Sequence, residues 1–303
     1  MDKVSVVIPT YNYGRFIAQA LESVFAQTLP PGEIVVVDDG STDDTENEVR
    51  KFGGTVRYIR QENKGVCAAR NNGAANCSGE YIAFLDADDI WEPEKLEKQI
   101  AKFGEDPEIG LVHCGMREFD SETGETVGIR TEGMEGCVAD ELLLWERPVI
   151  VGPGGTIVVS REAFDAVGGF DERMKVGEDW DFCYRVARKY KVGFVPEPLV
   201  NYRIHGAAAH RNVREMERGM GLFYEKAFAD GDKQVRSLRP RALGNYHRVL
   251  AGSYFRSGSY IDFIRHALKS IWYRPSGIGY FAAFPMRRFA QQGNAGGTDR
   301  VDG

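Results

Sequence analysis

Four consecutive residues, Asp86-Ala87-Asp88-Asp89, form a carboxylate cluster directly after an apolar run at residues 81–85. Asp86 and Asp88 are two residues apart, so in an extended segment both side chains leave the same face. Two carboxylates on one face favour a divalent cation, and Mg²⁺ or Mn²⁺ is usually bound by carboxylates together with substrate phosphate oxygens. The alternative is that Asp88 or Asp89 only caps a helix expected to begin at Pro93.

A second acidic pair, Glu178-Asp179, follows Gly177 and precedes a helical pattern. Carboxylates are electrostatically favoured at a helix N-terminus, which is one explanation for the pair. The other is that one carboxylate is a general base facing an acceptor hydroxyl. Arg203 and His205, two residues apart at a strand end, offer positive charge or a metal ligand for a diphosphate. A lone histidine near a strand end is more often an ordinary surface residue.

The end of the first expected strand carries Pro9-Thr10-Tyr11-Asn12. A dinucleotide-binding fold would have Gly-x-Gly-x-x-Gly at this place, so a nicotinamide or flavin site is disfavoured. The chain also lacks a Gly-x-x-x-x-Gly-Lys-[Ser/Thr] loop and a Gly-x-Ser-x-Gly nucleophile motif. Aromatic and hydroxyl groups suit a base and ribose, although a polar loop with a packed tyrosine would look the same.

The elements that position these groups can be predicted from the first 115 residues, in which β-branched runs alternate with amphipathic helical patterns. Such alternation is typical of a parallel sheet covered by helices, in which ligands gather at the carboxyl ends of the strands. Three expected strand ends carry polar residues. Strands are expected at residues 4–8, 34–37, 56–59, 81–85 and 110–114, and helices at 15–27, 45–52, 65–75 and from 93.

The second half predicts a more mixed pattern. A hairpin is expected at residues 121–128 and helices at 139–146, at 161–167 and up to about 190. Strands are expected at 155–160, 192–195 and 200–204. Beyond about 210 the sequence becomes helical and more basic. We therefore expect an α/β domain at residues 1–210, a helical region at 211–290 and a disordered tail at 291–303.

Charge and cysteine usage limit the classes of function. The 303 residues carry 38 Lys and Arg against 45 Asp and Glu, a net charge of −7, which disfavours a nucleic-acid partner. The five cysteines include no Cys-x-x-Cys pair and the N-terminus lacks a secretion-signal pattern, which favours a reducing, cytoplasmic location. No apolar run approaches the ~20 residues that span a bilayer.

Five segments in order resemble glycosyltransferase family 2, the inverting enzymes with the GT-A fold, a Rossmann-like mixed sheet flanked by helices. The resemblance covers about residues 3–205. No Gln-x-x-Arg-Trp segment of processive synthases is present, which favours transfer of one sugar per encounter. The matching segments are Val4 to Asn12, Glu33 to Asp43, Asn63 to Asn71, Phe84 to Asp89, and Gly177 to Asp181.

The resemblance implies a role for each matching residue. Thr10, Tyr11 and Asp39 would hold the nucleobase and ribose, with Pro9, Asn12, Arg70 and Ala87 beside the nucleotide sugar. Asp86 and Asp88 correspond to the Asp-x-Asp motif, with Asp88 the more direct ligand of Mn²⁺ or Mg²⁺ and His205 a further candidate ligand. Asp179 matches the base that deprotonates the acceptor, and Glu178, Trp180, Arg203 and His205 would lie on the acceptor or diphosphate side.

The implied function is transfer of a sugar, from a UDP-sugar by preference, to a glycan or lipid-linked glycan in surface polysaccharide or glycan assembly. The alternative is a non-catalytic module of the same fold that binds nucleotide sugars or glycans. Sequence leaves the oligomeric state open. The C-terminal helices place Arg265, Lys269, Arg274, Arg287 and Arg288 beside several aromatic residues. They would rest on the inner face of a membrane, or, as is commoner for aromatic stripes, cover the catalytic domain or form a dimer contact.

Overall fold

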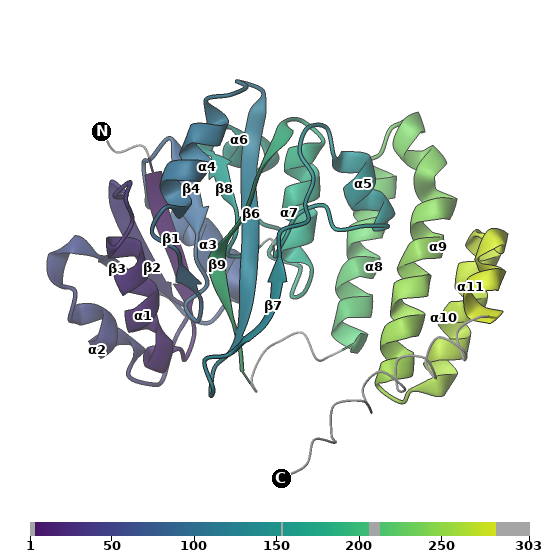
Figure 1. Ribbon diagram of the computed structural model, residues 1–303, viewed down its shortest axis with the longest axis horizontal. Helices are drawn as coiled ribbons and strands as arrows, with labels where there is room; N and C mark the ends of the chain where they lie inside the picture. Colours follow the sequence, from purple (N-terminus) through teal and green to yellow (C-terminus); the bar gives the residue numbers. More distant parts are fainter. Residues whose placement is uncertain (1–3, 153, 206–212, 283–303) are drawn as a thin grey trace, which may run out of the picture. The chain divides into compact units, whose positions relative to one another are not determined.

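The structure is a computed structural model that describes residues 4–152, 154–205 and 213–282 (Figure 1). The chain divides into two compact units, unit 1 with residues 1–143 and 147–225, and unit 2 with residues 144–146 and 226–303. The division falls within helix α8 (Val213–Ala229), whereas the sequence placed a domain boundary before this helix, near residue 210. The tail expected at residues 291–303 lies outside the described residues.

The first half of unit 1 follows the predicted alternation. Strands β3, β2, β1 and β4 lie side by side in that order, and all three pairings are parallel. The elements in chain order are β1 (Val4–Thr10), α1 (Gly14–Phe25), β2 (Glu33–Asp38), α2 (Thr45–Arg50), η1 (Gly53–Thr55), β3 (Arg57–Arg60), α3 (Val66–Ala75) and β4 (Tyr81–Phe84).

The second half extends the same sheet with strands of both directions. Beyond β4 the order is β8, β6, β9 and β5; β8 is antiparallel to β4 and β6, β6 is parallel to β9, and β7 pairs with β6. The sheet is therefore mixed, as the fold class predicted. The elements are β5 (Ile90–Trp91), α4 (Lys95–Phe103), β6 (Ile109–Asp120), β7 (Thr126–Arg130), α5 (Ala139–Leu144), β8 (Val158–Ser160), α6 (Arg161–Val167), α7 (Glu178–Ala187) and β9 (Lys191–Ile204).

Helices cover both faces of the parallel half because successive strand residues point to opposite sides. In β2, Ile34 and Val36 belong to one core with residues of α1, whereas Val35 and Val37 pack with Ala69 of α3. Helix α3 lies very close to the sheet, because a Cβ on Gly73 would stand 2.3 Å from Val7 Cγ1. Burial on both faces explains why these strands read as continuous apolar runs.

Three details of the sequence prediction were wrong. Helix α4 begins at Lys95 and not at Pro93, since Pro93 stands in the preceding turn. The two strands expected at 192–195 and 200–204 are one strand, β9, which continues through Pro196 and Pro198 with register shifts opposite β6. Strand β5 was missed because two residues give no periodic pattern.

The strand order fixes where a ligand would bind. The chain winds from β1 outward through β2 to β3 and then returns to β4 on the other side of β1. The carboxyl ends of β1 and β4 therefore form a topological switch point, the place at which open α/β sheets bind ligands. β1 ends at Thr10 and β4 ends two residues before Asp86.

Unit 2 is built on a helical hairpin of α9 (Lys233–Arg256) and α10 (Tyr260–Tyr273), followed by η3 (Pro275–Gly277) and α11 (Ile278–Ala282). The turn between the two long helices contains Gly258 with φ of 78°, a left-handed conformation that favours glycine. The side chain of Glu146 is bound by the guanidinium groups of Arg241 and Arg274. No helix within the described ranges combines the length and the apolar character needed to span a membrane.

Candidate active site

The carboxylate cluster at residues 86–89 forms a loop beyond the end of β4, and each aspartate has its own partner. Asp86 Oδ1 accepts a hydrogen bond of 2.8 Å from Arg70 Nη2 of α3, and Asp88 Oδ2 lies 2.9 Å from His205 Nε2. Asp89 Oδ1 accepts a bond of 3.0 Å from the backbone N–H of Arg203 in β9. Elements from both halves of unit 1 thus converge on this loop.

Close packing of these carboxylates changes their acidity. Burial and the neighbouring Asp86 raise the pKa of Asp88, and burial together with Asp88 raises the pKa of Asp89 well above its ordinary value. Tyr13, beyond the end of β1, also has a raised pKa because it is buried beside Asp88. The loops that follow β1 and β4 therefore meet. A positive charge bound between them would reduce the repulsion among the carboxylates.

Asp89 does not cap a helix, so the alternative explanation of the cluster was wrong. The N-cap position of α4 is Glu94, and no side chain makes a capping hydrogen bond there. Asp89 is almost fully buried and fastens β9 to the acidic loop through the N–H of Arg203. Its role is to hold the loop.

Arg70 connects the two acidic pairs. Its buried guanidinium donates from Nη2 to Asp86 and from Nη1 to Glu178 Oε1 at 3.3 Å, with the ring of Phe170 5.2 Å away. Burial alone would lower the pKa of Arg70, but the charges of Asp86 and Glu178 outweigh it and raise the pKa. The side chain stays charged and ties α7 to the acidic loop.

Glu178 and Asp179 occupy the first turn of α7, which begins after Gly177 with φ of 77°. Burial and the adjacent Asp179 raise the pKa of Glu178 to about 7, although Arg70 opposes the shift. Asp179 Oδ1 accepts a hydrogen bond of 2.7 Å from the N–H of Trp180, and the Trp180 indole donates to Leu142 O. The helix N-terminus thus brings Glu178 to Arg70, which also binds the acidic loop, with Asp179 next to Glu178 in the same turn.

His205 lies in a pocket of aromatic rings, with the ring centroids of Phe16 and Tyr13 at 5.4 and 6.0 Å. Its Nδ1 is buried and has no hydrogen-bond partner among the described residues. Arg203 donates from Nε to Asp88 O at 2.7 Å and from Nη2 to Gln19. Arg203 therefore supports the acidic loop, while the diphosphate contact expected of it stays a prediction.

Hydrogen bonds from side chains to loop backbone hold the residues that are expected at the nucleobase. Asp39 accepts hydrogen bonds from the N–H groups of Lys64 and Gly65 at 2.9 and 2.7 Å and from Gln61 Nε2 at 2.7 Å. A carboxylate has about four acceptor positions, so Asp39 keeps about one for a ligand. Thr10 is buried and its Oγ1 has no hydrogen-bond partner in the described ranges. Tyr11 is exposed.

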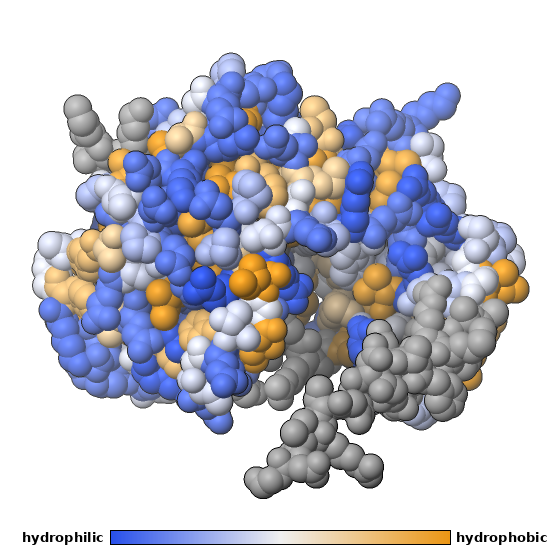
Figure 2. Space-filling model, in the orientation of Figure 1, coloured by the Kyte–Doolittle hydropathy of each residue, from blue (hydrophilic) through white to orange (hydrophobic). Residues whose placement is uncertain are grey.

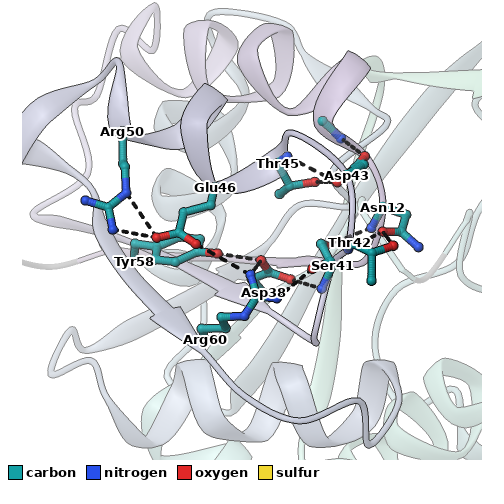
Figure 3. Close-up of polar contacts among 11 residues, drawn as sticks. Asn12, Asp38, Ser41, Thr42, Asp43, Thr45, Glu46, Arg50, Tyr58 and Arg60 are labelled. Carbon is teal, nitrogen blue, oxygen red and sulfur yellow. Dashed lines mark hydrogen bonds and ion pairs between the residues drawn. The ribbon is translucent and has the colours of Figure 1, made fainter.

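The turn at residues 38–45 shows how this network is built (Figure 3). Asn12, with φ of 59°, accepts from the N–H of Thr42 and donates its own N–H to Ser41. Buried Asp38 accepts from Ser41 N and Tyr58 Oη. Asn12 consequently joins the loops after β1 and β2, and its expected place beside the nucleotide sugar stays a prediction. Pro9 and Ala87 contribute buried backbone.

Sequence reasoning missed two glycines that face the acidic loop. A Cβ on Gly154 would stand 2.7 Å from Asp86 Oδ2 and 3.3 Å from Arg70 Nη2. A Cβ on Gly155 would stand 3.2 Å from Asp89 Oδ2. The run Gly152-Pro153-Gly154-Gly155 was a visible signal, but only the fold shows which side chains it approaches.

The donor set at this site suits a hard divalent cation. Asp86 and Asp88 supply oxygens and His205 supplies an imidazole whose second nitrogen lacks a partner in the described part of the chain. In the described ranges, no three His, Cys, Asp or Glu side chains are already arranged as a metal site. The residues fit a metal that shares its coordination sphere with a ligand such as a diphosphate.

The architecture is shared with solved glycosyltransferases. The chain is similar to residues 1–349 of S. aureus TarS in complex with UDP-GlcNAc, with a TM-score of 0.64 and 18% identity over 89% of this chain and 91% of that one. It is also similar to the mannosyltransferase PcManGT from Pyrobaculum calidifontis in complex with GDP-Man and Mn²⁺ (TM-score 0.63, 21% identity, 95% and 83% coverage). These likenesses establish the GT-A fold.

Relatives at higher identity give the family. Residues 5–168 match the model of Glycosyl transferase family 2. An uncharacterized glycosyltransferase of Rickettsia typhi is 32% identical over 270 residues, which cover 88% of this chain and 83% of that protein. The chain belongs to glycosyl transferase family 2, as the sequence predicted. Chondroitin synthase of Escherichia coli is 38% identical over 122 residues, 39% of this chain and 18% of that protein.

Proposed function

We propose that this glycosyltransferase inverts the anomeric carbon as it moves a sugar from a nucleotide diphosphate donor, preferably a UDP-sugar, to an acceptor hydroxyl. The observation that carries the proposal is the position of Arg70, which binds Asp86 of the acidic loop and Glu178 of the α7 N-terminus. The acidic loop and the N-terminus of α7, which also carries Asp179, are thereby held together at the switch point of the sheet, and this supports the proposal.

On the donor side we assign the nucleoside to Thr10, Tyr11 and Asp39 and the diphosphate to the loop at residues 86–89. Thr10 Oγ1, which lacks a hydrogen-bond partner among the described residues, and the remaining acceptor position of Asp39 support this assignment. Complexes of TarS with UDP-GlcNAc and of PcManGT with GDP-Man, on the same fold, support a nucleotide sugar as the donor.

We assign the binding of Mn²⁺ or Mg²⁺ to Asp88 and Asp86, with His205 as a further ligand. A bound divalent ion supplies positive charge that stabilises the departing diphosphate. The raised pKa of Asp88 and the Nδ1 of His205, which has no partner within the described ranges, support a cation at this place. Arg203, bonded to Asp88 O, keeps the loop in position for such an ion.

On the acceptor side we assign the general base to Asp179. The acceptor oxygen attacks the anomeric carbon, the bond from that carbon to the diphosphate oxygen breaks, and the acceptor proton passes to Asp179. Glu178 binds Arg70, so its carboxylate positions the guanidinium. We further propose a glycan or lipid-linked glycan as the acceptor, in surface glycan assembly; the likeness to chondroitin synthase supports the glycan acceptor.

The test is a panel of UDP-, GDP- and dTDP-sugars with Mn²⁺ and a set of glycan acceptors. We expect turnover with at least one donor, a product of inverted anomeric configuration by NMR, and loss of turnover in Asp88→Ala. Asp165→Asn, an exposed carboxylate on α6, is the matched control and should retain activity. Tight UDP binding in calorimetry without transfer to any acceptor would instead indicate a non-catalytic binding module.

A further inference from the structure

Helix α10 in unit 2 has apolar residues on two opposite faces. On the inner face His266, Ala267 and Ser270 are buried, and α10 packs on α9. On the outer face Ile261 and Trp272 are 85% and 84% exposed, with Ile264 and Leu268 at 54% and 64%.

These four exposed residues follow one another at intervals of three, four and four, so they form one continuous stripe along the helix. We call them the α10 stripe. Ile278 of α11 is 62% exposed as well, and Figure 2 shows hydrophobic side chains at the edge of the unit where α10 and α11 lie. Single exposed apolar residues are ordinary, but a contiguous stripe indicates a binding surface.

Two cations and one carboxylate border the stripe. Arg265 and Lys269 each directly follow a stripe residue and are exposed, while Asp262, which follows Ile261, pairs with Arg265 at 3.2 Å, so the edge carries a net positive charge. Unit 2 as a whole, residues 144–146 and 226–303, carries 13 Lys and Arg against 6 Asp and Glu. Its net charge is therefore +7 in a chain whose total is −7. The positive charge is concentrated in the unit that bears the stripe.

We propose that the α10 stripe binds the surface of an anionic lipid bilayer, with the helix lying in the plane of the interface. An amphipathic helix with Trp, Ile and Leu on one face and Arg and Lys at its edge suits the boundary between headgroups and acyl chains. Basic residues near an anionic leaflet add electrostatic attraction to the apolar contact. The stripe supplies the apolar contact and the +7 unit supplies the electrostatic attraction.

Two other occupants are disfavoured by charge. A second copy docked through the same face would bring Arg265 and Lys269 of each chain against those of the other, because such a contact is self-complementary. Residues 283–303 of the chain itself begin with a segment that carries Arg287 and Arg288, and these would meet the same positive edge. An anionic surface avoids both conflicts.

The test is co-sedimentation of the full chain with vesicles of phosphatidylcholine that contain 0% or about 30% phosphatidylglycerol, within the anionic range of such surfaces. We expect the protein to pellet with the anionic vesicles, and the triple variant Ile261→Ser, Leu268→Ser, Trp272→Ser to lose at least tenfold in partition coefficient. The matched control is Val127→Ser with Ile129→Ser on β7, which are comparably exposed and should leave binding unchanged.

A second measurement tests the face that docks. Trp272 emission should shift to shorter wavelength when anionic vesicles are added, and the shift should vanish in Trp272→Phe. Failure of the wild type to pellet, or pelleting of the triple variant like the wild type, would overturn the proposal. A dimer in sedimentation velocity that the triple variant loses would show a second copy as the occupant. Binding is measured without turnover, so its failure leaves the proposed transfer reaction untouched.

Discussion

Arg70 is the side chain on which most of the site depends. It is buried, carries its charge between Asp86 and Glu178, and reaches both through two different nitrogens. A planar guanidinium can make two such bonds in fixed directions, whereas an ammonium is a single point charge. The distance between the acidic loop and α7 is therefore set by the shape of this one group.

We predict that Arg70→Lys lowers kcat/KM by about 100-fold while the protein stays folded, because a lysine cannot bridge both carboxylates. Arg70→Ala should also lower the free energy of unfolding by about 1–3 kcal/mol, since it leaves the partly buried carboxylates of Asp86 and Glu178 without their shared partner. Kinetics and urea denaturation measure the two effects. Arg173→Lys, at an exposed pair with Asp171, serves as control and should change neither quantity.

Lys95 gives a second prediction, about pH and stability. Its Nζ is buried without a hydrogen-bond partner among the described residues, 3.9 Å from the Trp91 ring, and burial lowers its pKa from 10.5 to about 8. Below pH 8 Lys95 is charged in both the folded and the unfolded chain, so folding carries the full free-energy cost of burying the ammonium group. Between pH 8 and 10.5 the unfolded chain binds more protons, and the cost declines as pH rises.

Lys95→Met should therefore raise the free energy of unfolding at pH 7 by about 2 kcal/mol, and the gain should shrink when the same urea titration is repeated at pH 9.5. Lys98→Met provides the comparison, because Lys98 lies on the same helix and pairs with Glu94 and Glu197 at the surface. It should be neutral or slightly destabilising. If Lys95→Met raised the free energy of unfolding equally at both pH values, burial of a charged Lys95 would not be the cause.

At the scale of elements, the segment before β8 matters because its backbone passes over the acidic loop. We predict that Gly154→Ala lowers kcat/KM by about 100-fold, because the new Cβ at 2.7 Å would displace Asp86 Oδ2 and the Arg70 that binds it. Gly54→Ala is the matched control, since a Cβ there meets nothing within 4 Å. Wild-type activity in Gly154→Ala would show that this segment tolerates displacement.

Sequence predicted the elements that carry a local pattern. Strands β1, β2 and β4 are continuous apolar runs that end in polar residues, so both the strands and the switch-point site could be located. The sequence predicted two strands in place of β9 because Pro196 and Pro198 interrupt the apolar pattern. In the structure the pairing with β6 continues past both prolines. Local periodicity cannot show where a long-range pairing compensates for a broken run.

The contacts within the site were less accessible to sequence reasoning. The resemblance placed Arg70 near the donor and Asp179 at the acceptor, but the bond from Arg70 to Glu178 joins residues 108 positions apart and could be seen only in the fold. Asp89 looked like a helix cap because a helix follows, yet its oxygen bonds to β9. Gly154 carried no sign of its closeness to Asp86 beyond a glycine-rich run.

At the scale of the whole molecule, the chain separates an acidic unit from a basic one. With +7 on unit 2 and −7 overall, unit 1 carries −14 and holds every residue assigned to the transfer site. The match to the family extends over residues 5–168, so Asp179 and His205 come from the part of unit 1 that follows it. The central claim is that this later part completes the reaction centre.

Single-turnover transfer by Asp179→Asn, measured beside UDP affinity from calorimetry, tests that claim most directly. We predict that the variant binds UDP within about twofold of the wild type while transfer falls by about 10³-fold, because only proton removal from the acceptor is lost. Transfer within tenfold of the wild type at unchanged UDP affinity would contradict the account.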